Sequence, residues 1–212
     1  MCGIFGSLGI ELDPRRLRLA LESVRHRGPD DWGVWASSLD GSLQQRLKPE
    51  LGSTPWSRSN LSDDLWGSLT PAPITLGHVR LTILDLTRES HQPMLLEESG
   101  ASVALVFNGE IYNYIELRAE LRKGGYNFES TGDSEVVLKS YLAWGPSCVN
   151  RFNGFFAFAI WDGREKNLFA ARDRLGQKPF YFHQQSDRGL FFASEIKAFW
   201  HLGLLQPQVD KG

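Results

Sequence analysis

The sequence has little of what directs a chain to a membrane, a nucleic acid or a disulfide-linked fold. It contains only two cysteines in 212 residues, and no apolar run approaches the roughly 20 residues that span a bilayer. The formal net charge of −2 gives no electrostatic basis for binding nucleic acid or anionic lipid. The opening segment MCGIFGSLGIELD lacks the basic start of a secretory signal peptide. We therefore expect no nucleic-acid or membrane partner, and a cytoplasmic protein whose Cys2 and Cys148 are reduced.

Motifs for metals and nucleotides are also missing. The five histidines and two cysteines show no zinc-type spacing, and there is no GxxxxGKS/T phosphate-binding loop. We expect no metal and no cofactor in this domain, so its own side chains must carry any chemistry.

The hydrophobic pattern predicts one domain of short strands and paired helices. Helices are expected from Pro14 to before Gly28, and over 116–123, 134–144 and 194–201. Strands are expected over 3–10, 32–36, within 75–86, and over 101–107, 155–161, 167–171, 179–183 and 189–193. Because the strands come in hairpin-like runs rather than alternating with helices, the pattern favours an α+β fold with antiparallel sheets.

Residues 38–73 interrupt this rhythm, since they are rich in Ser, Pro, Asn, Asp and Gly. The composition predicts a long, partly folded surface insertion, with Trp56 and Trp66 exposed on it. A partner-docking surface is the alternative. The domain itself is expected to span residues 2–200, with 201–212 as a tail or the start of a linker.

Cys2 offers a specific chemical opportunity. Removal of Met1 would leave an α-amino group and a thiol on one residue, with pKa values of roughly 7.7–8.0 and about 8.5. The amine can then take the thiol proton, so no histidine is needed as a base. For this reason a Cys–His pair with His26, His78 or His91 is not favoured. The alternative is that Cys2 is an incidental small residue.

A series of segments, taken together and in order, resembles the glutaminase domain of asparagine synthetase. That domain is a class II glutamine amidotransferase, one of the N-terminal-nucleophile hydrolases. The segments are MCGIFG, HRGPDDWG (26–33), LGHVRLTILDL (76–86), HQPM (91–94), FNGEIYNY (107–114), TGDSE (131–135), RFNGFFAFAIWD (151–162), ARDRLGQKPFYF (171–182) and FASEIKAF (192–199). The resemblance implies a four-layer αββα sandwich of two antiparallel sheets. The insertion at 38–73 departs from it, because relatives connect there with a shorter loop.

The resemblance also implies the catalytic residues. Cys2 would be the nucleophile, while the Asn108 side-chain amide and the Gly109 backbone N–H would stabilise the oxyanion of the tetrahedral intermediate. Read alone, Asn108-Gly109 at a strand end is equally typical of a hairpin turn.

The remaining implied residues bind glutamine. Arg80 would bind its α-carboxylate through a two-pronged contact, and Asp133, with help from Glu110, its α-ammonium. Arg80 could instead be a surface arginine, and Asp133 could instead cap the following helix. The resemblance also implies that the pocket is shaped by Leu81, Ile83 and Leu84. It implies that a loop near the site is ordered by Arg27, Gly28 and Asp30.

The implied function is hydrolysis of glutamine to glutamate and ammonia, with the ammonia used to make asparagine from aspartate. The partner would be a C-terminal synthetase domain, attached or acting in trans, and ATP and Mg would bind only there. A homodimer is a further option. Two alternatives stay open: an amidotransferase acting on another carboxylate, such as a sugar acid or peptide, and a silent interaction module if Met1 is retained.

Overall fold

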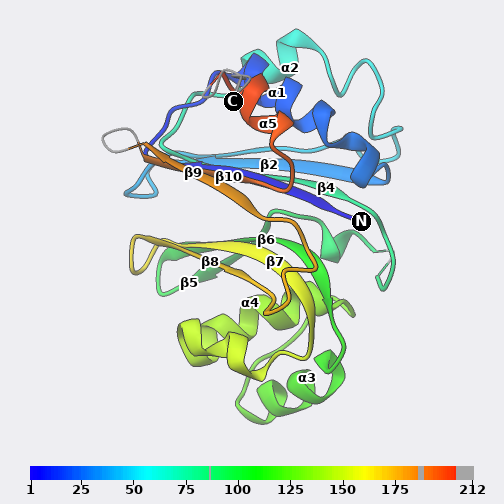
Figure 1. Cartoon of the computed structure of the whole chain (residues 1–212), viewed down its shortest axis with the longest axis vertical. Coiled ribbons are helices and arrows are strands. Elements are labelled where there is room, and N and C mark those ends of the chain that lie inside the picture. Colours follow the sequence, from blue (N-terminus) through cyan, green and yellow to red (C-terminus); the bar gives the residue numbers. More distant parts are fainter. Residues whose placement is uncertain (86, 186–188, 204–212) are drawn as a thin grey trace, which may run out of the picture.

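The computed structural model describes residues 1–85, 87–185 and 189–203 and contains two antiparallel sheets stacked on each other (Figure 1). Sheet A has six strands in the order β3-β2-β4-β1-β10-β9, and sheet B has four in the order β5-β6-β7-β8. The strands of sheet A are β1 (Gly3–Leu8), β2 (Asp31–Ser37), β3 (Gln44–Leu47), β4 (Ile74–Arg80), β9 (Tyr181–Gln185) and β10 (Gly189–Ala193). Those of sheet B are β5 (Met94–Glu98), β6 (Ala101–Ile111), β7 (Gly154–Asp162) and β8 (Asn167–Arg172).

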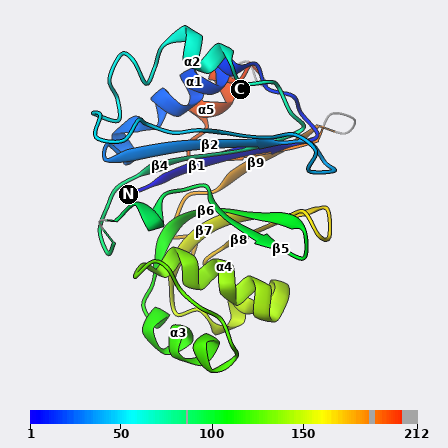
Figure 2. The same cartoon turned by 180° about the vertical axis from the view of Figure 1, so that it is seen from behind.

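Helices cover the outer face of each sheet, as the opposite views of Figures 1 and 2 show. Sheet A carries α1 (Pro14–Ser23), α2 (Asp63–Gly67) and α5 (Lys197–His201), and sheet B carries α3 (Tyr114–Lys123) and α4 (Asp133–Trp144). Short 3-10 helices lie at Arg25–Arg27, Arg88–Ser90 and Gly145–Arg151. The predicted α+β architecture with four αββα layers is therefore confirmed. None of the helices described is long and apolar enough to cross a membrane.

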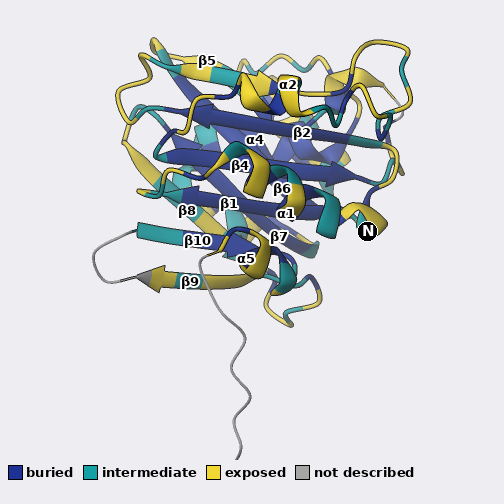
Figure 3. Ribbon diagram, turned by 90° about the horizontal axis from the view of Figure 1, so that it is seen from above, coloured by how far each residue is buried: buried dark blue, intermediate teal, exposed yellow. Residues whose placement is uncertain are grey.

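The alternation of side chains along each strand decides which residues lie between the sheets. Ile4 of β1, Leu76 of β4 and Val106 of β6 belong to the apolar cluster between the sheets. Phe5 and Phe107, one residue further along, instead join the two outer clusters beneath the helices. Buried residues fill the central strands β2, β4 and β1, whereas the edge strand β9 is largely exposed (Figure 3).

The 38–73 segment is not the loosely folded surface loop that its composition predicts. It contributes β3 to the edge of sheet A and contains α2. Trp56 and Trp66 are 8% and 0% exposed, and Trp66 stacks on Trp32 with ring centroids 5.4 Å apart. The buried Asn60 amide ties the intervening turns together by donating to Ser53 Oγ and to two backbone carbonyls. The prediction of exposed tryptophans was wrong because their burial comes from sheet A, which local composition does not reveal.

Several element boundaries also differ from expectation. Strand β6 continues through Asn108-Gly109 to Ile111, so the pair lies within a strand rather than at its end or in a hairpin turn. Strand β5 was not predicted, and α5 begins at Lys197 rather than Ser194. Phe182 lies in the expected strand but is 66% exposed, because β9 is an edge strand. Cys148 is fully buried. Most of the expected tail, residues 204–212, lies outside the described residues.

Candidate active site

A cavity of about 270 Å³ opens where the inner faces of the two sheets meet near the N-terminus. Strand alternation directs three side chains to this place. Cys2 precedes Ile4 by two residues, Arg80 follows His78 by two, and Asn108 follows Val106 by two, so each takes the inner face. All of the predicted catalytic and glutamine-binding residues line the cavity: Cys2, Arg80, Leu81, Ile83, Leu84, Asn108, Gly109, Glu110 and Asp133.

The Cys2 thiol is held against the backbone of Leu81. The Leu81 N–H donates to Cys2 Sγ at 3.4 Å, and Sγ lies 3.6 Å from the Leu81 carbonyl oxygen. Burial raises the pKa of the Cys2 thiol, while the Leu81 N–H and nearby positive charges act in the opposite direction. Among the described contacts, no histidine bonds to Cys2. His26 pairs with Glu195, His91 with Asp31, and His78 with the Phe107 carbonyl.

Asn108 presents an unused hydrogen-bond donor to this cavity. The residue is 1% exposed, and its Nδ2 atom has no hydrogen-bond partner within the described part of the chain. A buried unsatisfied amide costs on the order of 1–3 kcal/mol, so such a donor is typical of a site that a substrate completes. Gly109 must be glycine, because a Cβ there would lie 2.4 Å from the Phe155 carbonyl oxygen on β7.

Arg80 supports the wall of the cavity as well as lining it. Its guanidinium donates to the Thr87 carbonyl at 2.9 Å and to the Asp85 carbonyl, which holds the loop after β4 in place. Asp85 in turn accepts from the Thr131 and Gly132 N–H groups at 2.8 and 3.2 Å, next to the start of α4. Arg80 is 8% exposed, which excludes the alternative of an ordinary surface arginine.

Asp133 also lines the cavity, at the first residue of α4. It is 6% exposed, and its Oδ2 accepts from the Ile111 N–H at 2.9 Å. Burial raises the pKa of this carboxyl group to about 6, and the nearby Glu110 charge contributes. A cation placed beside Asp133 would reverse that shift. Gly132, not Asp133, occupies the N-cap position of α4, so the alternative capping role is wrong.

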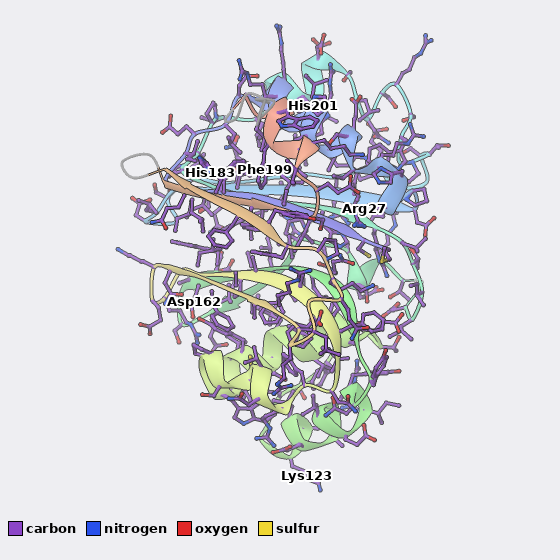
Figure 4. All side chains as sticks on the ribbon, in the orientation of Figure 1. Arg27, Lys123, Asp162, His183, Phe199 and His201 are labelled. Carbon is purple, nitrogen blue, oxygen red and sulfur yellow. The ribbon has the colours of Figure 1, made fainter. Side chains whose placement is uncertain are left out.

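The three residues expected to order a nearby loop lie outside this cavity. Arg27, at the N-terminal edge in Figure 4, pairs through Nε with Glu195 at 2.8 Å. Gly28 packs against the β4 backbone, where a Cβ would lie 2.3 Å from the Val79 carbonyl carbon. Asp30 does contact the loop that lines the cavity, because its carboxylate accepts from the Thr82 N–H at 2.7 Å.

Sequence reasoning missed two cavity residues with evident structural roles. Gln92 accepts from the Phe107 N–H at 2.7 Å and donates to Ser134 Oγ at 3.2 Å, so it links β6 to α4. Lys178 is 8% exposed and lines the cavity from the connection between β8 and β9. Both lie in recognised segments, HQPM and ARDRLGQKPFYF, which was the only signal available.

The arrangement of two stacked antiparallel sheets between helical layers is also found among solved amidotransferases. Glutamine phosphoribosylpyrophosphate amidotransferase from B. subtilis has the same fold, with a TM-score of 0.77 at 24% identity over 95% of this chain and 44% of that one. The sequence model of the glutamine amidotransferase domain matches residues 59–212. The chain therefore belongs to the glutamine amidotransferase domain family, a family of enzymes.

Two curated relatives extend this comparison. Glutamine-hydrolysing asparagine synthetase 3 of Bacillus subtilis is 34% identical over 215 residues, which cover 100% of this chain and 29% of the relative. Amidase chry2 of Gibberella zeae is 32% identical over 188 residues, which cover 89% of this chain and 23% of the relative. The chain thus spans less than a third of the length of either relative.

Proposed function

We propose that this domain hydrolyses the side-chain amide of glutamine to glutamate and ammonia, with Cys2 as the nucleophile once Met1 is removed. The observation that carries the proposal is that Cys2 and Asn108 line the same cavity. Within the described residues, the buried Nδ2 atom of Asn108 has no hydrogen-bond partner. Acyl transfer needs this pair of functions: a nucleophile, and a donor for the oxygen that becomes negative.

The proposed reaction proceeds through a thioester. The α-amino group of the new N-terminus takes the Cys2 thiol proton, and the thiolate adds to the glutamine Cδ carbonyl carbon. Asn108 and Gly109 stabilise the resulting oxyanion. As the intermediate collapses, the C–N bond breaks and the ammonium group returns its proton to the departing nitrogen, which leaves as ammonia. Water then cleaves the γ-glutamyl thioester, releasing glutamate and regenerating the thiol.

The charged residues that line the cavity support glutamine as the substrate. Arg80 uses some of its N–H donors on loop carbonyls, and a guanidinium has five, so others are available for an α-carboxylate. Asp133 and Glu110 provide negative charge for the α-ammonium group. Ile83 and Leu84 are 59% and 45% exposed, so they would cover the substrate from the solvent side.

The ammonia is proposed to serve a synthetase domain, attached or in trans, that uses ATP and Mg to convert aspartate to asparagine. The relationship to an asparagine synthetase from Bacillus subtilis supports this acceptor. A second candidate is another carboxylate or amide substrate in the whole protein, which the relationship to a fungal amidase favours. The glutamine site is common to both.

The unprocessed chain would be inactive in this scheme. Met1 is 55% exposed and itself lines the cavity, and while it is attached Cys2 has no free amine. In that state the fold would be a silent binding module.

Ammonia release from glutamine by protein of verified intact mass tests the proposal. Protein lacking Met1 should release ammonia, whereas Cys2→Ala and a form with a retained N-terminal extension should not. Cys148→Ala is the matched control, because Cys148 is buried away from the cavity, and it should retain activity. Equal activity of Cys2→Ala and wild type would refute the mechanism.

A further inference from the structure

Lys178 is a buried cation for which the steps above have no use. It lies on the connection from β8 to β9, which crosses from sheet B to sheet A beside the cavity. The residue is 8% exposed and lines the same cavity as Cys2. Lysine is seldom buried to this extent without a paired charge, so its position needs a reason.

The structure offers this ammonium group no carboxylate partner. No Asp or Glu oxygen lies within 4.0 Å of Lys178 Nζ anywhere in the described ranges. Its Nζ atom lies over the face of the Phe155 ring, 4.2 Å from the ring centroid. Phe155 also lines the cavity, so the ammonium is held at the cavity wall by an aromatic face that leaves its charge unneutralised.

The backbone around Lys178 is fixed on both sides. Its N–H donates to Asp173 Oδ2 at 3.1 Å, and its carbonyl oxygen accepts from Arg172 Nε at 2.5 Å. Asp173 also accepts from the N–H groups of Phe156 and Gln177 at 3.2 and 2.9 Å. The only nearby carboxylate in this connection is therefore occupied by backbone amides, and it holds the lysine in position without pairing with its side chain.

We propose that Lys178 is a positioning residue that keeps a positive charge at the cavity wall in order to stabilise the Cys2 thiolate. The reacting amide is neutral, and negative charge develops on the reacting atoms only when the thiolate and the oxyanion form. A fixed positive charge therefore favours these states over bound glutamine. This inference rests on the proposed role of Cys2.

The electrostatic effects on both residues agree with this arrangement. Burial raises the pKa of the Cys2 thiol, while the terminal amine, Arg80 and Lys178 act to lower it. Burial lowers the pKa of Lys178, while the charges of Cys2, Glu110 and Asp173 raise it and that of Arg27 lowers it. The terminal amine and Arg80 also act on the sulfur, but the proposed steps already use them as the base and as the α-carboxylate ligand, so Lys178 is the one of these three cations without another role.

Alkylation of Cys2 by iodoacetamide across pH, followed by intact mass, tests this without requiring turnover. In Met1-free protein, Lys178→Met should raise the midpoint of the Cys2 alkylation profile by about one pH unit, as expected when a nearby opposite charge is lost. Lys178→Arg should keep the wild-type midpoint. Lys123→Met is the matched control, because Lys123 is exposed on α3 at the far end of the molecule and its loss should change nothing (Figure 4).

Lys178→Gln is measured in parallel so that a second uncharged variant is available if Lys178→Met does not fold. Cys148 reports folding, because it is buried and stays unmodified while the fold is intact. A folded, uncharged variant with the wild-type midpoint would overturn the proposal. The shift in midpoint would stand even if glutamine were not the substrate, whereas loss of alkylation at Cys2 in wild type would contradict the proposed function itself.

Discussion

The side chain of Gln92 accepts a hydrogen bond from the Phe107 N–H at 2.7 Å, immediately before Asn108, the proposed oxyanion donor. Its other end donates to Ser134 Oγ, immediately after Asp133, the proposed partner of the substrate ammonium group. One buried amide thus holds two parts of the site that lie on different elements.

Gln92→Met should therefore lower kcat/KM about tenfold and destabilise the domain by about 1–3 kcal/mol, because the buried Phe107 N–H is left unpaired. Gln45→Met is a matched control, because Gln45 makes two similar hydrogen bonds with the Thr70 backbone away from the cavity. It should reduce stability slightly and leave kcat/KM intact. Thermal unfolding and glutaminase kinetics measure both effects, and equal kinetics for the two variants would contradict a positioning role for Gln92.

Asn108→Ala should lower kcat by about 10²–10³ with little change in KM, because the donor acts on charge that appears only in the transition state. Asn113→Ala serves as the control, since Asn113 bonds only to the backbone around Arg151 and Asn153. Steady-state ammonia release measures both. A rise in KM at constant kcat would show that Asn108 binds ground-state glutamine instead.

Gly109→Ala should disrupt both stability and activity, because the new Cβ would lie 2.4 Å from the Phe155 carbonyl oxygen and force β6 and β7 apart. Gly67→Ala is the comparison, since a Cβ there meets nothing within 4 Å and Gly67 ends helix α2. We expect that change to be neutral or slightly stabilising. Melting temperatures of the two variants provide the measurement, and similar values would argue against close packing at Gly109.

The raised pKa of Asp133 predicts an unusual pH dependence. Because the folded pKa of about 6 exceeds the ordinary value of 3.8, the folded state binds more protons between these values. Stability from this group is thus fully present below about pH 4 and falls as pH rises through 6, by at most about 3 kcal/mol. In denaturant unfolding, Asp133→Asn should remove this dependence of the free energy of unfolding on pH.

The same ionisation should affect substrate affinity. A glutamine ammonium group needs the charged form of Asp133, so KM should fall as pH rises through about 6. Asp133→Asn should raise KM at neutral pH and abolish this dependence. If KM in wild type were constant from pH 5 to 7, Asp133 would not contact the ammonium group.

Trp66→Ala tests the packing of the 38–73 segment. Trp66 is 0% exposed and stacks on Trp32, so its truncation should cost about 3–5 kcal/mol of unfolding free energy. Trp200→Ala, at a residue that is 48% exposed, should cost much less. Urea unfolding compares the two. If both variants lost a similar, small free energy of unfolding, the 38–73 segment would not be packed into the core as described.

Much of the site could be predicted because its residues lie in short sequence segments that follow one another in the same order as in the family. Cys2, Arg80, Asn108 and Asp133 each lie within such a segment, and strand alternation then turns the first three toward one cavity. Gln92 could not be assigned a role, because its two hydrogen bonds span 15 and 42 residues of sequence.

The prediction for the 38–73 segment failed for a different reason. Turn-forming residues dominate its composition, while the hydrophobic contacts of Trp56 and Trp66 are made with sheet A and helix residues distant in sequence. Lys178 illustrates the same limit, since nothing in its neighbouring residues indicates that its side chain lies against Phe155 at the cavity wall.

Cys2, the proposed nucleophile, directly precedes β1 of sheet A, whereas Asn108, the proposed oxyanion donor, lies in β6 of sheet B. The apolar layer between the sheets therefore has a second significance. Small side chains such as Ala104, Ala157 and Ala159 alternate there with Trp35 and Trp161. The volume of these residues sets the spacing of the sheets, and with it the separation of Cys2 from Asn108. The packing between the sheets thus fixes the distance between the reacting groups. A change of one methyl group in this layer would alter catalysis, although it would lie far from every reacting atom.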